Sequence, residues 1–112
     1  KCLIVLDELF SSTNYKEGFS GSAAIVKKIG SFDNVSTIIT THYSNLPKYA
    51  KKYGYTNYKF PVKKDNGQLN YTYKIKKGIS NDFVALDILR INNYDTDIID
   101  DAQEIMKTLK TK

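Results

Sequence analysis

The chain has little of several residue types on which specialised folds depend. Its 112 residues include one cysteine, one histidine, two prolines and no tryptophan. The single thiol, Cys2, cannot form an internal disulfide or build the usual zinc clusters, so we expect it to act as a small apolar residue. No segment approaches the roughly 18 apolar residues of a membrane span, and no signal peptide is visible. These absences argue against a disulfide-rich secreted module, a zinc finger and a membrane protein, and they predict an intracellular protein of unspecified compartment.

Arginine is also scarce. Lys and Arg together number 17 against 12 Asp and Glu, which gives a net charge of +5, but Arg90 is the only arginine in the sequence. A mild basic excess permits contact with nucleic acid without requiring it, and the reading of base sequence favours arginine over lysine. A surface that reads DNA sequence is therefore not expected in this chain. The apolar fraction of 41% is enough for a packed core.

Residues 1–43 predict a strand, a helix and a second strand. Leu3–Leu6 is an unbroken aliphatic run, which is typical of a strand buried on both faces. A helix is expected over about Gly18–Ile29, followed by Gly30 in the position of a C-cap glycine. Val35–Thr40 is rich in β-branched residues and predicts the second strand. This order predicts a parallel pair of strands joined by a right-handed crossover.

Polar residues follow both predicted strands. Asp7 and Glu8 end the first strand, and Thr41 and His42 come directly after the second. The carboxyl ends of parallel strands share one edge of the sheet, and open α/β sheets place their ligands at that edge. We therefore expect these four side chains to lie close together.

The rest of the chain predicts a short helix, a β-hairpin and two terminal helices. The turn residues at 65–67, Asp-Asn-Gly, are a strong hairpin signal. The short helix is expected over Asn45–Tyr53, and the two strands of the hairpin over Thr56–Lys63 and Leu69–Ile75. The terminal helices are expected over Asn81–Ile91 and from Asp95 or Thr96 onward, where either residue can cap the last helix. The last helix carries an apolar stripe that serves as core, as a dimer contact or as both: Ile98, Ile99, Ala102, Ile105, Met106 and Leu109.

The segment Leu3–Glu8 matches the Walker B pattern, in which four apolar residues precede Asp-Glu. A buried strand is rigid, so its end holds two carboxylates at fixed positions. In such a site Asp7 holds Mg²⁺, usually through water, and Glu8 orients and polarises the attacking water. Taken alone, the hexapeptide also fits a strand that ends in an acidic turn.

His42 is the one histidine in the sequence, and it follows a β-branched strand that comes one crossover after Asp-Glu. In ABC-type ATPases a histidine at this place contacts the γ-phosphate of ATP. A neutral imidazole suits that role because it can donate one hydrogen bond and accept another. The alternative is that His42 is a structural or surface residue, as lone histidines more often are.

Together these motifs resemble the MutS family of mismatch-repair ATPases. The resemblance covers essentially the whole chain and is most specific over residues 3–18 and 40–43. Its matching parts are Leu-Ile-Val-Leu-Asp-Glu at 3–8, Glu-Gly at 17–18 after a polar loop, a small-residue helix, Thr-Thr-His-Tyr at 40–43, Leu46, Gly78, and Ile-Ile-Asp-Asp-Ala at 98–102.

The resemblance implies an α/β fold, namely the C-terminal portion of an ABC-type P-loop NTPase domain, with a mostly parallel sheet, a β-hairpin and two C-terminal helices. Residues 1–112 would form the C-terminal portion of a MutS-type ATPase domain without the P-loop, since no Gly-x-x-x-x-Gly-Lys-Ser/Thr occurs in the sequence. The implied cofactors are ATP and Mg²⁺. Glu8 and His42 would be the catalytic residues, and Asp7 would hold the metal. The chain begins without Met, as expected of a piece of a longer protein, and by itself it should neither bind ATP tightly nor hydrolyse it.

The activity implied for the full-length protein is Mg²⁺-dependent ATP hydrolysis coupled to the binding of mismatched double-stranded DNA. The DNA would be contacted through domains outside this chain, and the assembly would be a homodimer or heterodimer of MutS-like subunits, with no membrane involved. Ser12, Thr13 and Asn14 would belong to the loop that crosses the dimer interface beside the nucleotide. In that loop Phe10-Ser11-Ser12 replace the family's Gly-Arg-Gly, which removes a charged contact and two residues with easy access to positive φ.

Two other functions are compatible with the sequence. The first is a different ABC-type DNA-maintenance ATPase, acting in recombination or chromosome maintenance, and the Thr-His-Tyr ending argues against it. The second is a catalytically degenerate module that serves structural dimerisation. Retention of Asp7, Glu8 and His42 argues against that, because a decayed site is expected to lose at least one of them.

Lysines and tyrosines interleave over residues 48–64. Such a segment either binds single-stranded nucleic acid by charge and stacking, or forms a solvated basic face whose tyrosines pack on the sheet. Packing is favoured, because MutS-like proteins contact DNA mainly through upstream domains.

Overall fold

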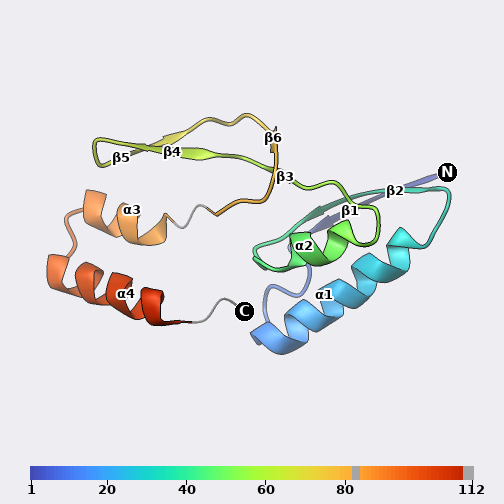
Figure 1. The fold of residues 1–112 in the computed structure, drawn as a ribbon, viewed down its shortest axis with the longest axis horizontal. Coiled ribbons are helices and arrows are strands. Elements are labelled where there is room, and N and C mark those ends of the chain that lie inside the picture. Colours follow the sequence, from blue (N-terminus) through green and yellow to red (C-terminus); the bar gives the residue numbers. More distant parts are fainter. Residues whose placement is uncertain (82–83, 110–112) are drawn as a thin grey trace. The chain divides into compact units, whose positions relative to one another are not determined.

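The computed structural model describes residues 1–81 and 84–109 and divides the chain into two compact units, Lys1–Asn57 and Tyr58–Lys112 (Figure 1). The first unit contains two strands and two helices, in the order β1 (Cys2–Asp7), α1 (Tyr15–Gly30), β2 (Val35–Thr40) and α2 (Leu46–Lys51). None of the helices in these described ranges is long and apolar enough to cross a membrane.

Strands β1 and β2 pair in parallel, as the sequence predicts. The register runs from Cys2 opposite Val35 to Asp7 opposite Thr40, so both strands end at the same edge. Helix α1 is the crossover between them. Two of its buried side chains, Ala23 and Val26, form the core of this unit together with Leu46 and Ala50 of α2.

The prediction that β1 is buried on both faces is wrong for this chain. The face that bears Ile39 packs on the core formed by α1 and α2. The opposite face carries Leu3, Val5 and Ile38, whose exposed fractions are 64%, 63% and 58%. Cys2, which was expected to be a buried apolar residue, is also exposed. The strand has the composition of a two-sided core strand, but this unit supplies a covering layer on one side only.

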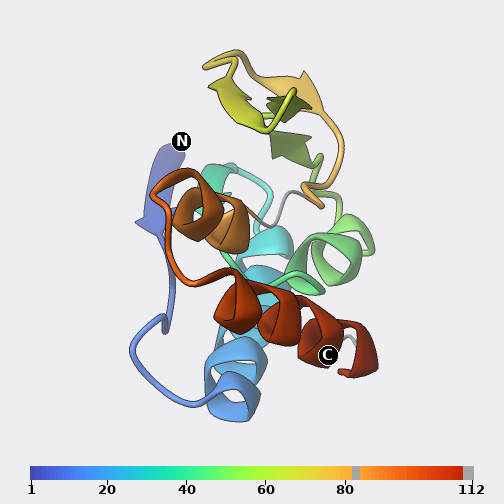
Figure 2. The same cartoon turned by 90° about the vertical axis from the view of Figure 1, so that its left-hand side faces the viewer.

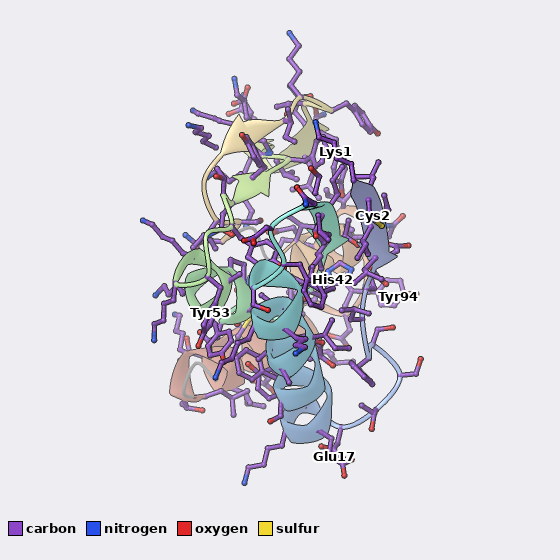
Figure 3. All side chains as sticks on the ribbon, turned by 90° about the vertical axis from the view of Figure 1, so that its right-hand side faces the viewer. Lys1, Cys2, Glu17, His42, Tyr53 and Tyr94 are labelled. Atoms are coloured by element: carbon purple, nitrogen blue, oxygen red, sulfur yellow. The ribbon has the colours of Figure 1, made fainter. Side chains whose placement is uncertain are left out.

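Helix α1 begins three residues before its predicted start because Asn14 caps it. The Asn14 side chain accepts a hydrogen bond from the Glu17 N–H at 2.9 Å, and the Glu17 carboxylate accepts one from the Asn14 amide in return. Figure 3 shows Glu17 in this first turn, at the lower end of the helix. The polar segment that the sequence indicated as loop is therefore partly helical.

Gly30 does not act as a left-handed C-cap, which corrects the sequence prediction. It is the last residue of α1, and the following Ser31 keeps a right-handed conformation with φ −84°. A Cβ at Gly30 would lie only 2.9 Å from the Tyr53 carbonyl oxygen. Glycine at this position therefore allows the close approach of the α2 segment to the end of α1.

The tyrosines that follow β2 pack within the first unit. Tyr49 lies 5.2 Å from Tyr53 and 6.4 Å from Phe19, measured between ring centroids, and Figure 3 shows Tyr53 beside α1. The Tyr55 hydroxyl donates to the Val26 carbonyl at 3.0 Å. Burial raises the pKa of Tyr55, and the hydrogen bond from Tyr53 raises the pKa of Tyr49. The packing interpretation therefore holds for Tyr49, Tyr53 and Tyr55, which contact one another or α1, and it does not hold for Tyr58, which is 53% exposed.

The second unit combines short antiparallel strands with two helices. Its elements are β3 (Tyr58–Lys59), β4 (Val62–Asp65), β5 (Gln68–Tyr71), β6 (Lys76–Lys77), α3 (Ala85–Ile91) and α4 (Thr96–Thr108). The predicted hairpin is confirmed: β4 and β5 are antiparallel, and the turn residues Asn66 and Gly67 have φ values of 49° and 75°, as a type I′ turn requires.

Both long strands predicted for the second unit are interrupted. Pro61, which has no N–H for a strand ladder, separates β3 from β4. Tyr73, with a left-handed φ of 52°, lies between β5 and β6. Strand β3 pairs with β6 antiparallel. Within the described ranges only β1 and β2 are parallel, so the mostly parallel sheet is not seen within this chain.

The terminal helices are present, but their burial differs from the prediction. Asp95 caps α4 by accepting from the Asp97 N–H, and Arg90 of α3 pairs with Asp100 of α4 at 2.9 Å; Figure 2 shows these two helices in orange and red. Of the predicted stripe, Ile99 is fully buried and Ala102 partly buried. The others are exposed: Ile98, Ile105, Met106 and Leu109. The predicted start of the helix at Asn81 runs into residues 82–83, which lie outside the described residues.

Candidate functional site

The two predicted catalytic side chains meet at the edge where β1 and β2 end. His42 Nε2 lies 2.5 Å from Glu8 Oε1. Glu8 directly follows β1, and His42 lies two residues after β2, so the parallel register brings together residues that are 34 positions apart. The side chains are 86% exposed for His42 and 43% exposed for Glu8. The pair is therefore open to solvent and accessible to a ligand.

Asp7 is held at the same edge by a residue that the sequence did not single out. The Thr40 hydroxyl donates a hydrogen bond to Asp7 Oδ1. The Thr40 hydroxyl oxygen also accepts a hydrogen bond from the Glu8 N–H at 3.1 Å. The Glu8 N–H also donates to the Thr40 carbonyl at 3.0 Å. The signal that could have identified Thr40 is its place directly opposite Asp7 in a parallel register.

The loop after β1 is fastened to the rest of the first unit. The Phe10 carbonyl accepts from the Tyr43 hydroxyl at 2.5 Å, and the Leu9 carbonyl accepts from the Ser22 hydroxyl at 3.1 Å. Ser22 is fully buried. Tyr43 directly follows His42, so one short segment contacts both the carboxylate site and this loop.

Phe10 keeps the backbone conformation that a glycine would adopt easily. Its φ is 55°, although the side chain makes this region unfavourable by roughly 1–2 kcal/mol. A left-handed backbone conformation is therefore adopted at this position without a glycine. The Phe10 ring lies beside Gly21 of α1, where an added Cβ would come within 3.0–3.2 Å of ring atoms.

The remaining predicted site residues lie between this loop and α1. Ser12 and Thr13 are exposed, and Asn14 caps the helix. Their part in nucleotide binding across a dimer interface stays a prediction.

The carboxylates at this edge fit a site for one hard divalent cation shared with a ligand. The described part of the chain contains no cluster of three or more His, Cys, Asp or Glu side chains that could hold a metal alone. Magnesium does not need such a cluster, because it is usually held by one or two carboxylates together with waters and phosphate oxygens. Asp7, at the end of a paired strand, supplies a donor of that kind.

Removing His42 is expected to leave the stability of the chain almost unchanged. A pair this exposed contributes about 0–1 kcal/mol, so His42→Ala should lower the free energy of unfolding by less than about 1 kcal/mol. Urea unfolding followed by circular dichroism measures this. A loss well above that range would mean that His42 is a structural residue.

Comparison with known proteins identifies the family of this chain. The model of the MutS domain V family matches residues 1–110. The chain is 28% identical to the DNA mismatch repair protein MutS of Aquifex pyrophilus over 98% of its length and 36% identical to the Endonuclease MutS2 of Finegoldia magna over 93%. It is 29% identical to the DNA mismatch repair protein MutS of Halothermothrix orenii over 98%. The chain belongs to the MutS domain V family.

The chain spans about an eighth of these relatives: 13% of the Aquifex and Finegoldia proteins and 12% of the Halothermothrix protein. The family match establishes that these residues form a small α/β segment of a MutS-type protein.

Proposed function

We propose that this chain is the C-terminal portion of a P-loop ATPase domain in a MutS-type DNA-repair protein, and that it supplies the hydrolytic edge of the ATP site. The observation that carries the proposal is the contact between Glu8 and His42, 2.5 Å apart where the two parallel strands end. The adjacent Asp7 adds a carboxylate suited to Mg²⁺.

Each of the three residues has a distinct chemical part in ATP hydrolysis. Asp7 would hold Mg²⁺ through water, and the ion would neutralise charge on the ATP phosphates. Glu8 orients and polarises the attacking water, since its carboxylate can accept a proton. A neutral His42 has one N–H, which in this structure faces the Glu8 carboxylate at 2.5 Å. Donating that hydrogen bond to the γ-phosphate would release Glu8, so His42 would relate the presence of the phosphate to the position of the base.

The full-length protein completes this site. The sequence contains no P-loop, so the phosphate-binding loop comes from another segment, and residues 1–112 alone are inactive. Ser12, Thr13 and Asn14 lie in the loop that approaches the nucleotide of a second MutS-like subunit. The protein binds mismatched double-stranded DNA through other domains and couples that binding to ATP turnover.

A second candidate keeps the ATPase and changes the DNA substrate. The Finegoldia magna relative, 36% identical over the aligned residues, is named an endonuclease. In this alternative the same segment powers a DNA-maintenance protein that acts on structures other than mismatches, such as those of recombination.

The test is ATP turnover by the full-length protein with no DNA, with matched duplex and with mismatched duplex. We expect turnover that requires Mg²⁺ and changes with mismatched DNA. Turnover that responds equally to both duplexes, but differently to a branched DNA, would favour the second candidate. Absence of ATP turnover under all these conditions would refute the proposal.

A further inference from the structure

We propose that Thr40 is a positioning residue for both acidic residues of the site and acts on them through a single hydroxyl group. The inference rests on the ATPase function proposed above and deepens it. Thr40 acts through Asp7 and Glu8. Its hydroxyl is hydrogen-bonded to both residues, and the strand register fixes the position of that hydroxyl.

The register fixes where the hydroxyl lies. Thr40 and Asp7 are the last opposed residues of the β1–β2 pair. The Thr40 hydroxyl donates to Asp7 Oδ1 and accepts from the Glu8 N–H at 3.1 Å. A hydroxyl has one proton to donate, so its proton is committed to the carboxylate while a lone pair receives the amide. This arrangement fixes one orientation of the Asp7 carboxylate.

The backbone of Glu8 also depends on Thr40. Glu8 has a left-handed φ of 50°, a conformation that non-glycine residues adopt only when their surroundings hold them there. Its N–H is bonded by two oxygens of Thr40, the hydroxyl at 3.1 Å and the carbonyl at 3.0 Å. The turn at Glu8 directs its side chain to His42, so Thr40 helps to set the geometry of the catalytic pair.

The consequence concerns how the site receives a metal ion. Because Thr40 engages Asp7 Oδ1, the other carboxylate oxygen is the one that would accept a hydrogen bond from a metal-bound water. Groups that orient a metal-binding carboxylate by hydrogen bonds typically change metal affinity or activity by about 10–100-fold when they are removed. Thr40 is a group of this kind, because it would orient the metal-binding carboxylate of Asp7 without binding the metal itself.

The experiment compares Thr40→Val, Thr40→Ala and Thr40→Ser in the full-length protein. Valine keeps the β-branched shape that suits a strand, alanine removes the hydroxyl in a different shape, and serine retains it. The first readout is Mn²⁺ binding in the presence of ADP, measured by electron paramagnetic resonance. The second is the Mg²⁺ concentration for half-maximal ATP turnover. Valine and alanine should each weaken Mn²⁺ binding by about 10-fold or more and raise the Mg²⁺ requirement, while serine stays within about twofold.

Ser36→Ala is the matched control. Ser36 lies on the same face of β2, four residues before Thr40, which is about 13 Å along a strand, and it is opposite Leu3. Its replacement should change neither readout. Suppose that Thr40→Val or Thr40→Ala binds Mn²⁺ as tightly as the wild-type protein does, and that wild-type turnover depends on Glu8. This result overturns the proposed role of Thr40 and leaves the proposed function standing. Absence of Glu8-dependent turnover in the wild-type protein overturns the proposed function, and the Thr40 inference with it.

Discussion

Replacing Glu8 with glutamine is expected to lower ATP turnover by the full-length protein by about 10²- to 10⁴-fold, the contribution of a positioned general base. Glutamine keeps the length of the side chain and can still hydrogen-bond to His42, which lies 2.5 Å from the Glu8 carboxylate. An amide, however, cannot take a proton from water. Nucleotide should therefore still bind while hydrolysis is lost. Steady-state phosphate release measures turnover, and binding of a fluorescent ATP analogue measures affinity.

Glu104→Gln is the control for this prediction. It makes the same chemical change in an exposed residue that pairs with Lys107 in α4, and turnover should be unaffected. Equal turnover in Glu8→Gln and the wild-type protein would mean that Glu8 is not the catalytic carboxylate. If both variants and the wild type are inactive while nucleotide still binds, the chain is the degenerate structural module.

Replacing Gly18 with alanine is expected to destabilise the first unit. The new Cβ would lie 1.9 Å from the Tyr43 hydroxyl oxygen and 2.8 Å from the Phe10 carbonyl oxygen, so it would displace both partners of the hydrogen bond that fastens the loop. Overpacking of this kind costs about 1–3 kcal/mol, which equals or exceeds the roughly 1 kcal/mol that alanine gains over glycine in a helix. Urea unfolding of the chain measures the difference.

Gly21→Ala supplies the matched comparison within the same helix. Its Cβ would meet Phe10 ring atoms at 3.0–3.2 Å, but that ring is 47% exposed and free to shift outward. The helix-propensity gain is the same at both positions, so the two variants should differ by about 1–3 kcal/mol, with Gly18→Ala the less stable. Equal stabilities would show that Tyr43 moves at little cost and that its contact with Phe10 does not hold the loop.

The sequence predicted the crossover unit well because its signals are local and consistent. The β-branched run of β2 matched the observed bounds Val35–Thr40, and the strand-helix-strand order brought Glu8 and His42 together as expected. Thr40 was missed as a site residue because its role depends on the register, which no local pattern reveals.

Burial was predicted less well because it depends on neighbours that a pattern does not specify. The unbroken apolar run of β1 and the apolar stripe of α4 are both compatible with core positions, yet Leu3 and Ile105 are 64% and 59% exposed. Backbone conformation at the loop was also unpredictable from residue type, since Phe10 occupies a left-handed turn that its side chain disfavours.

The hydrogen bonds at the site join residues that are far apart in the sequence, and this separation affects when the site can form during folding. The Thr40–Asp7 and Tyr43–Phe10 hydrogen bonds each close a separation of 33 residues, and the bond from the Glu8 N–H to the Thr40 hydroxyl closes 32. The closures have nearly equal entropic costs, and the cost of closing a long loop must be met before its contacts can stabilise the chain. The site should therefore form in a single step late in folding, so a nascent chain that ends before β2 carries Asp7 and Glu8 but no preformed catalytic geometry.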